Sequence, residues 1–149
     1  MPPTATCHQL SVVDIAIISR HNCWHQQVIF ALMAINYEVY NKAVNALANA
    51  LALPEDDISR DASIQRFEFC IELAWKTARR HLGTATTGPK QVVREMAQAE
   101  LIENVGLWLE AIDQRNLSSH TYNEEIARKV YNFAGDFLSE LQLLSNRLN

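Results

Sequence analysis

The sequence predicts an all-α protein, folded as an antiparallel bundle of four to five helices. Apolar residues recur at steps of three and four over long stretches, which is the period of an amphipathic helix. Glycine and proline are scarce, with four of each, and few segments alternate as β-strands do. With 149 residues, of which 48% are hydrophobic and 20% charged, the chain suits a single domain with a packed core.

The regular helical pattern begins near residue 37. In YEVYNKAVNALANALAL, apolar residues at helical spacing predict the first helix of the bundle, and Pro54 with the acidic EDD is expected to end it. The residues before this point mix short apolar runs with His, Cys and Trp and show no clear period. We therefore divide the chain into an N-terminal extension over 1–35, to which we assign no role, and a bundle domain over 36–149.

Met33 stands immediately before the regular pattern and offers a second start for the protein. On that interpretation the residues ahead of it have little role in folding. On the other, their apolar runs form an extra helix that packs on the bundle. The same segment holds two cysteines and two histidines whose spacing fits no common zinc finger: Cys7, His21, Cys23 and His25. We predict no metal site and no cofactor.

The clearest predicted helix covers SIQRFEFCIELAWKTARRHLG. Its core stripe consists of residues spaced by three and four: Ile64, Phe67, Ile71, Ala74, Ala78 and Leu82. Glu72 and Lys76 are placed for a favourable ion pair one turn apart. Gly83 suits the left-handed position that often follows the end of a helix.

Three further helices are predicted over residues 89–99, about 104–116 and about 122–146. Pro89 suits the first turn of the earliest of them, where its missing amide hydrogen costs nothing. Thr121 followed by Glu124 matches a capping box, so we expect this pair to start the last helix. The short connections between the helices favour antiparallel neighbours.

The net charge of −4 does not favour general binding of polyanions. Residues 60–94 are an exception, with seven basic residues against three acidic ones, so a local basic face is one interpretation and ordinary solvated helix faces are the other. Three cysteines without framework spacing indicate a reducing compartment. No apolar run is long enough to span a bilayer, and the basic start of a secretory signal is missing, so we expect a cytoplasmic protein without a membrane segment.

A polar stretch, DQRNLSSHTYNEE, lies where one predicted helix should end and the next begin. In one continuous helix, Arg115 and His120 would point about 140° apart. Asn116 and the two serines that follow it compete with helical hydrogen bonding, so we predict a bend just after Asn116 that lets both side chains face one pocket. A histidine can move a proton near pH 7 and an arginine suits phosphate oxygens, so the pair could cleave RNA without a metal. The alternative is that Arg115 pairs with Asp113 or helix-end carbonyls and His120 is an ordinary loop residue.

The segment RNLSSHTY resembles the R-x4-H-x-Y motif of the HepT-like proteins, helical-bundle members of the HEPN superfamily. A polar residue directly after the arginine, here Asn116, is part of that pattern. Two longer blocks, RFEFCIELAWKTARRHL and GPKQVVREMAQAELIENVGLWLEAIDQRNLSSHTYNEEIA, resemble the branch called nucleotidyltransferase substrate-binding protein-like. The resemblance covers residues 36–146.

This resemblance implies a homodimer with the motif residues near a cleft at the dimer interface, and a minimal nucleotidyltransferase as partner. In HepT-type pairs the bundle protein is a metal-independent ribonuclease toxin, so RNA is an implied substrate. Arg115 and His120 would then be catalytic, with Asn116 supporting them. The partner neutralises the toxin by adenylylating the motif tyrosine, which corresponds to Tyr122. An AMP group there would add bulk and negative charge beside the catalytic pair and repel RNA.

Two other functions are compatible with the sequence. One is a non-catalytic substrate-binding or regulatory subunit of the nucleotidyltransferase, and the other is a structural interaction domain with a vestigial cleft. The acidic net charge disfavours general RNA binding unless the basic residues of 60–94 line the cleft. Glu68 and Glu72 lie one turn apart and could face one cleft, where they would be functional, but we expect them to form salt bridges instead. Trp75 and Trp108 are expected to anchor the core or the dimer interface, and base stacking is the alternative.

Overall fold

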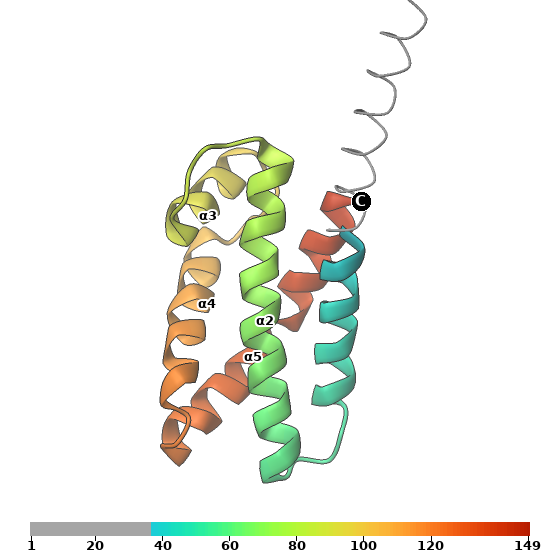
Figure 1. Ribbon diagram of the computed structural model, residues 1–149, viewed down its shortest axis with the longest axis vertical. Helices are drawn as coiled ribbons and strands as arrows, with labels where there is room; N and C mark the ends of the chain where they lie inside the picture. Colours follow the sequence, from blue (N-terminus) through green and yellow to red (C-terminus); the bar gives the residue numbers. More distant parts are fainter. Residues whose placement is uncertain (1–36) are drawn as a thin grey trace, which may run out of the picture. The chain divides into compact units, whose positions relative to one another are not determined.

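The computed structural model describes residues 37–149, which belong to a compact unit over Ile35–Asn149. Every regular element in this part is helical (Figure 1). In order, these elements are a helix over residues 37–51, α2 (Asp57–Leu82), α3 (Pro89–Gln98), α4 (Val105–Leu117), a 3₁₀ turn η1 (Ser118–His120) and α5 (Glu124–Leu148). The long helices alternate in direction, as Figure 1 shows, which confirms the predicted antiparallel all-α bundle.

Some predictions fall outside the described residues: those for Cys7, His21, Cys23, His25 and Met33. The division of the chain into an extension and a bundle domain also stays a prediction. Of the helices within residues 37–149, not one combines the length and the apolar character that a membrane span requires.

Aromatic rings from three helices meet at the centre of the bundle. Phe67 of α2 contacts Phe133 and Phe137 of α5, with ring centroids 5.9 and 6.3 Å apart. Trp108 of α4 packs edge-on against Phe137 at 4.9 Å. Such offset and edge-to-face pairs are the favoured arrangements of aromatic side chains, so they fix how α2, α4 and α5 pack together.

The predicted apolar stripe of α2 and the helically spaced apolar residues of α5 face this core. In α2 the buried members are Ile64, Phe67, Ile71, Ala74 and Ala78, while Leu82 at the end of the helix is only partly covered. In α5 the buried members are Val130, Phe137, Leu141 and Leu144, and Ile126 and Phe133 are partly covered. Helical spacing in the sequence therefore located the core correctly.

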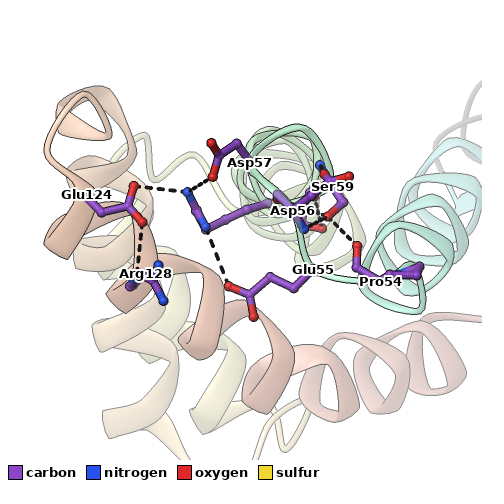
Figure 2. A network of polar contacts seen from close by, with 9 residues as sticks. Pro54, Glu55, Asp56, Asp57, Ser59, Glu124 and Arg128 are labelled. Carbon is purple, nitrogen blue, oxygen red and sulfur yellow. Dashed lines mark hydrogen bonds and ion pairs between the residues drawn. The ribbon is translucent and has the colours of Figure 1, made fainter.

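The start of α2 differs from the prediction. Asp56 accepts a hydrogen bond from the Ser59 amide at 2.6 Å, and the Asp56 amide donates to Ser59 Oγ at 2.8 Å, which together form a capping box (Figure 2). The acidic EDD therefore begins α2 instead of ending the helix before it, which stops at residue 51. The other end of α2 agrees with the prediction, because Gly83 takes the left-handed conformation with a φ of 63°.

The start of α5 also corrects the prediction. Asn123 is its N-cap, and its side-chain oxygen accepts from the amides of Glu125 and Ile126 at 2.9 and 3.3 Å. Thr121 does not cap α5, because its hydroxyl donates to the carbonyl of Ser118 at 3.1 Å and so closes the preceding 3₁₀ turn. The capping box expected at Thr121 was therefore wrong, and the helix starts two residues later.

Candidate functional site

The chain leaves the α4 helix at the serines of the motif. The Ser118 hydroxyl donates to the carbonyl of Arg115 at 2.6 Å, and the Ser119 hydroxyl donates to that of Asn116 at 3.0 Å. In a continuing α-helix these carbonyls would accept hydrogen bonds from backbone amides of the next turn. The serine hydroxyls compete with those bonds, so α4 ends and η1 follows. The α-helix ends after Leu117, one residue later than the predicted bend, but the backbone keeps right-handed helical angles at Ser118 and Thr121 and is extended at Asn123.

Arg115 lies in the last turn of α4, and two of its guanidinium nitrogens contact neighbouring side chains. Its Nη2 is 3.0 Å from a carboxylate oxygen of Glu72 on α2, and its Nη1 donates to Asn116 Oδ1 at 3.2 Å. The Arg115 Nε is buried and has no hydrogen-bond partner in the described part of the chain. The alternative pairing with Asp113 does not form, because Asp113 instead binds Lys90 at 2.6 Å.

Glu72 connects Arg115 to two further groups on α2. The Trp75 indole nitrogen donates to the same carboxylate oxygen that Arg115 contacts, Oε2, at 3.2 Å, and Lys76 Nζ lies 2.7 Å from the other oxygen. Burial acts to raise the pKa of Glu72, but the hydrogen bonds from Lys76 and Trp75 and the charge of Arg115 outweigh burial. The pKa of Glu72 is therefore lowered, and the salt bridge predicted between Glu72 and Lys76 is confirmed.

An open groove of about 450 Å³ runs along α2 beside Arg115. Its lining consists of Gln65, Arg66, Glu68, Phe69, Glu72 and Arg115. A volume in this range suits one small ligand or one nucleotide unit. The groove is therefore the candidate binding surface that includes Arg115.

The groove carries an exposed cation, a carboxylate and an exposed aromatic ring. Neither Arg66 nor Glu68 has an ion-pair partner among residues 37–149, so the salt bridge expected for Glu68 was wrong. Phe69 is 57% exposed, which is unusual for a phenylalanine inside a helix. Of the basic residues in 60–94, Arg66 is the one that lines this groove.

His120 and Tyr122 form a second pair, outside that lining. Their rings are 6.0 Å apart at an interplanar angle of 75°, and Tyr122 is 88% exposed. His120 ends η1 and is also exposed, and its carbonyl accepts from the Asn123 amide at 3.1 Å. An exposed imidazole and phenol on one turn are accessible to a macromolecular substrate or to a modifying enzyme.

The structure thus joins the four motif residues in two pairs. Arg115 contacts Asn116, and His120 contacts Tyr122. Within the described chain, no hydrogen bond, ion pair or ring contact connects Arg115 to His120. Direct contact of the guanidinium and the imidazole with one phosphodiester therefore stays a prediction.

The sequence indicated this groove only through Glu68 and Glu72, which both line it. The expectation that the tryptophans are packing residues agrees with the structure. Trp108 is a core anchor, buried, with its indole nitrogen donating to Glu140 at 3.1 Å. Trp75 is half-buried beside the core, with Lys76 Nζ 5.5 Å from its ring centre. Phe69 was a further signal for the groove that the sequence analysis did not use, since it is an aromatic residue outside the apolar stripe of its helix.

A family model, a curated relative and two solved structures show which known proteins this chain resembles. The family model described as nucleotidyltransferase substrate binding protein like matches residues 35–149. A relative named probable ribonuclease HepT, from Haemophilus influenzae, is 36% identical over 94 residues. That match spans 58% of this chain and 64% of the relative, so less than two thirds of the relative is covered.

Two solved structures share the fold. A protein from Thermus thermophilus aligns with a TM-score of 0.70 at 32% identity, over 74% of this chain and 98% of that one. A Haemophilus influenzae protein, described as having the fold of a substrate binding domain of a nucleotidyltransferase, aligns with a TM-score of 0.58 at 28% identity, over 79% and 97%. This chain belongs to the nucleotidyltransferase substrate binding protein like family, in agreement with the resemblance found in its motifs.

Proposed function

We propose that this protein is a metal-independent endoribonuclease that works beside a minimal nucleotidyltransferase, as the HepT-type toxin of a cytoplasmic toxin–antitoxin pair. The observation that carries the proposal is the partly exposed guanidinium of Arg115 in the groove, followed by the exposed imidazole of His120 on the next turn. The similarity to a probable ribonuclease HepT supports the same activity.

The proposed chemistry needs only groups that the chain supplies. The 2′-hydroxyl of the RNA attacks the neighbouring phosphorus, the bond from phosphorus to the 5′-oxygen breaks, and a cyclic phosphate and a 5′-hydroxyl result. His120 transfers the proton at one of these two oxygens, and water takes up or supplies the proton at the other. Arg115 binds the non-bridging oxygens, where negative charge grows in the transition state. Asn116 holds Arg115 through the hydrogen bond between their side chains.

We propose that the active form is a homodimer, with the catalytic cleft at its interface. Exposed apolar side chains on α2 support this arrangement, because Ile58 and Phe69 are eleven residues apart and so lie on one face of the helix. Large apolar residues exposed on one face commonly mark an interface. Light scattering on the purified chain should give twice the chain mass, and Phe69→Glu should shift it toward the monomer.

Tyr122 is the proposed target of the partner. Its phenolic oxygen would attack the α-phosphorus of ATP, forming a phosphodiester to AMP and releasing pyrophosphate, with loss of the phenolic proton. The exposure of Tyr122 supports access by a second enzyme. Incubation with the nucleotidyltransferase and ATP should add the mass of AMP to the chain and add nothing to Tyr122→Phe.

The decisive test is cleavage of single-stranded RNA in EDTA by the unmodified full chain. We expect cleavage, and we expect His120→Ala to reduce it by at least about a hundredfold, the usual effect of a general acid or base. His81→Ala is the matched control. His81 is also exposed, but it lies in the last turn of α2, where it contacts the Tyr37 hydroxyl, and it is not part of the motif. A wild-type chain without activity, or an unimpaired His120→Ala, would refute the ribonuclease assignment.

A second candidate is a non-catalytic subunit that presents a substrate to the nucleotidyltransferase. The similarity to a protein described as a substrate binding domain of a nucleotidyltransferase favours it. On this account the groove binds a ligand and the chain cleaves nothing. Absence of RNA cleavage together with complex formation between the two proteins would select this candidate.

A further inference from the structure

Arg60 is the one charged residue that is buried within residues 37–149. Its side chain is 6% exposed, and its Nη2 contacts Asp57 at 2.8 Å and Glu124 at 3.0 Å. Its Nη1 is 3.6 Å from Glu55. Figure 2 shows these carboxylates converging on one guanidinium.

These carboxylates come from two distant segments. Glu55 and Asp57 belong to the start of α2 and the turn before it, whereas Glu124 is the first residue of α5, 64 positions from Arg60. Arg60 therefore ties the start of α2 to the start of α5 (Figure 2). No part of the proposed chemistry uses this contact.

The start of α5 is continuous with the turn that carries the motif. Glu124 follows Tyr122 by two residues and His120 by four. The Asn123 amide donates to the His120 carbonyl at 3.1 Å, and the Asn123 side chain caps α5. A displacement of Glu124 would therefore be passed through Asn123 to His120 and Tyr122.

A buried arginine is a poor choice if stability alone matters. Taking a guanidinium out of water costs free energy, and the attraction of carboxylates as exposed as Asp57 and Glu124 only partly offsets that cost. The Nε of Arg60 is also buried without a hydrogen-bond partner among the described residues, which adds an unfavourable contribution. What the charged contact supplies instead is a defined direction and distance between two helix ends.

We propose that Arg60 is a positioning residue, which holds Glu124 and thereby fixes the turn that presents His120 and Tyr122. The consequence for RNA cleavage rests on the proposed ribonuclease function, but the positioning itself is measured without any activity.

Arg128 provides the matched control. It binds the other carboxylate oxygen of Glu124, Oε1, at 2.9 Å, while Arg60 binds Oε2. Arg128 lies on α5 itself, one turn after Glu124, so it cannot tie α5 to α2. Loss of the Arg128 contact removes an equal charge next to the same carboxylate and leaves the link between the helices in place.

The test compares Arg60→Met, Glu124→Gln and Arg128→Met in the full chain. Amide hydrogen exchange is followed over residues 123–127, and the ring contact of His120 with Tyr122 by nuclear Overhauser effects. We expect Arg60→Met and Glu124→Gln each to raise the amide exchange rates roughly fivefold to tenfold and to weaken the contact between the His120 and Tyr122 rings. Both variants remove the same ion pair, so their effects are coupled. The double variant should add little to either single one. Arg128→Met should change the rates less than about twofold.

For RNA cleavage, we expect Arg60→Met and Glu124→Gln to lower kcat more than they raise KM, with partial recovery in Arg60→Lys. Unchanged exchange and an intact ring contact in folded Glu124→Gln would overturn the positioning role. Glu124 is 60% exposed, so this variant keeps the test valid even where Arg60→Met does not fold. If no form of the chain cleaves RNA, the ribonuclease proposal is refuted, while exchange and ring contact still decide the role of Arg60.

Discussion

Arg60 and Arg115 are both bound by carboxylates, yet their surroundings differ in a way that separates a structural arginine from an available one. Arg60 is 6% exposed and has three carboxylates around it. Arg115 is 35% exposed, has one carboxylate and one amide, and lines an open groove. Arg60 is therefore surrounded by more carboxylates than its single charge can neutralise, whereas Arg115 is partly exposed and, on the proposed function, would bind a phosphate.

The carboxylates that bind the two arginines also differ in what remains bound to them when the arginine is lost. Glu72 is shared with Lys76 and Trp75, so it retains favourable contacts when a phosphate takes its place on the guanidinium. Glu124 likewise has a second partner in Arg128, but removal of Arg60 would leave Glu55, Asp57 and Glu124 without the cation that holds them together. Loss of Arg115 should therefore reduce mainly activity, whereas loss of Arg60 should also reduce stability.

The largest expected effect is on RNA cleavage. Arg115→Ala should lower kcat by about a hundredfold or more, because a group that stabilises transition-state charge contributes that much in comparable sites. Its melting temperature should change little, since the ion pair with Glu72 is partly exposed. Cleavage rates and thermal melts of the same preparation check both parts, and undiminished cleavage would contradict the proposed role of Arg115.

Arg60→Met should lower the stability of the fold, which the Arg115 variants should leave nearly unchanged. We expect its melting temperature to fall by several degrees, and by clearly more than that of Arg115→Met, because it leaves several carboxylates close together without their cation. Differential scanning calorimetry compares the two variants directly. Equal losses would remove the distinction between a structural and an available arginine.

A smaller change is expected from the competing carboxylate. Glu72→Gln should tighten binding of a 2′-O-methyl RNA oligonucleotide, which cannot be cleaved, by roughly two- to fivefold, the range of a partly exposed ion pair. Glu103→Gln is the control, since it changes net charge equally but pairs with Arg147 away from the groove. Fluorescence anisotropy measures both, and equal tightening would assign the effect to net charge.

The pH dependence of stability gives a related prediction. Because the pKa of Glu72 is below its ordinary value near 4.5, its carboxylate stabilises the fold above that pH. This contribution is lost as the pH falls through the lowered pKa. The difference in melting temperature between wild type and Glu72→Gln should therefore narrow as the pH drops below about 4.5. A constant difference across this range would contradict the ion-pair account.

The smallest effect concerns the cap of α5. Asn123→Ala should cost about 1 kcal/mol of unfolding free energy, the usual loss for an N-cap side chain. Thr121→Ala should cost less, since Thr121 closes only the 3₁₀ turn. Urea denaturation gives the free energy of unfolding of both variants. A larger decrease for Thr121→Ala than for Asn123→Ala would indicate that Thr121 is the N-cap of α5.

The sequence predicted what depends on local spacing. Apolar residues at helical intervals gave the bundle and most of its core, and Gly83 and Pro89 marked helix boundaries correctly. The cap of α5 was misassigned because Thr121 with Glu124 matches the capping box, whereas Asn123 has Ile126 three residues later. Both threonine and asparagine cap helices, and local pattern does not rank these two. The folded chain ranks them by using the Thr121 hydroxyl within η1.

The candidate site depends on contacts that no local pattern contains. Glu124, one of the three partners of Arg60, is 64 residues away from it, and Glu72 on α2 contacts Arg115 on α4. Both contacts follow from how α2 packs against its neighbours, which the aromatic core decides. Arg115 and His120 themselves were predictable because they stand in one short motif.

The central claim is that Arg115 and His120 act on the same phosphodiester. Cleavage rates of Arg115→Ala, His120→Ala and the double variant test it most directly. Groups that act as one unit are strongly non-additive, so the double variant should be no more than a few-fold slower than the worse single variant. Losses that multiply fully would show that the two side chains act independently and would contradict the claim.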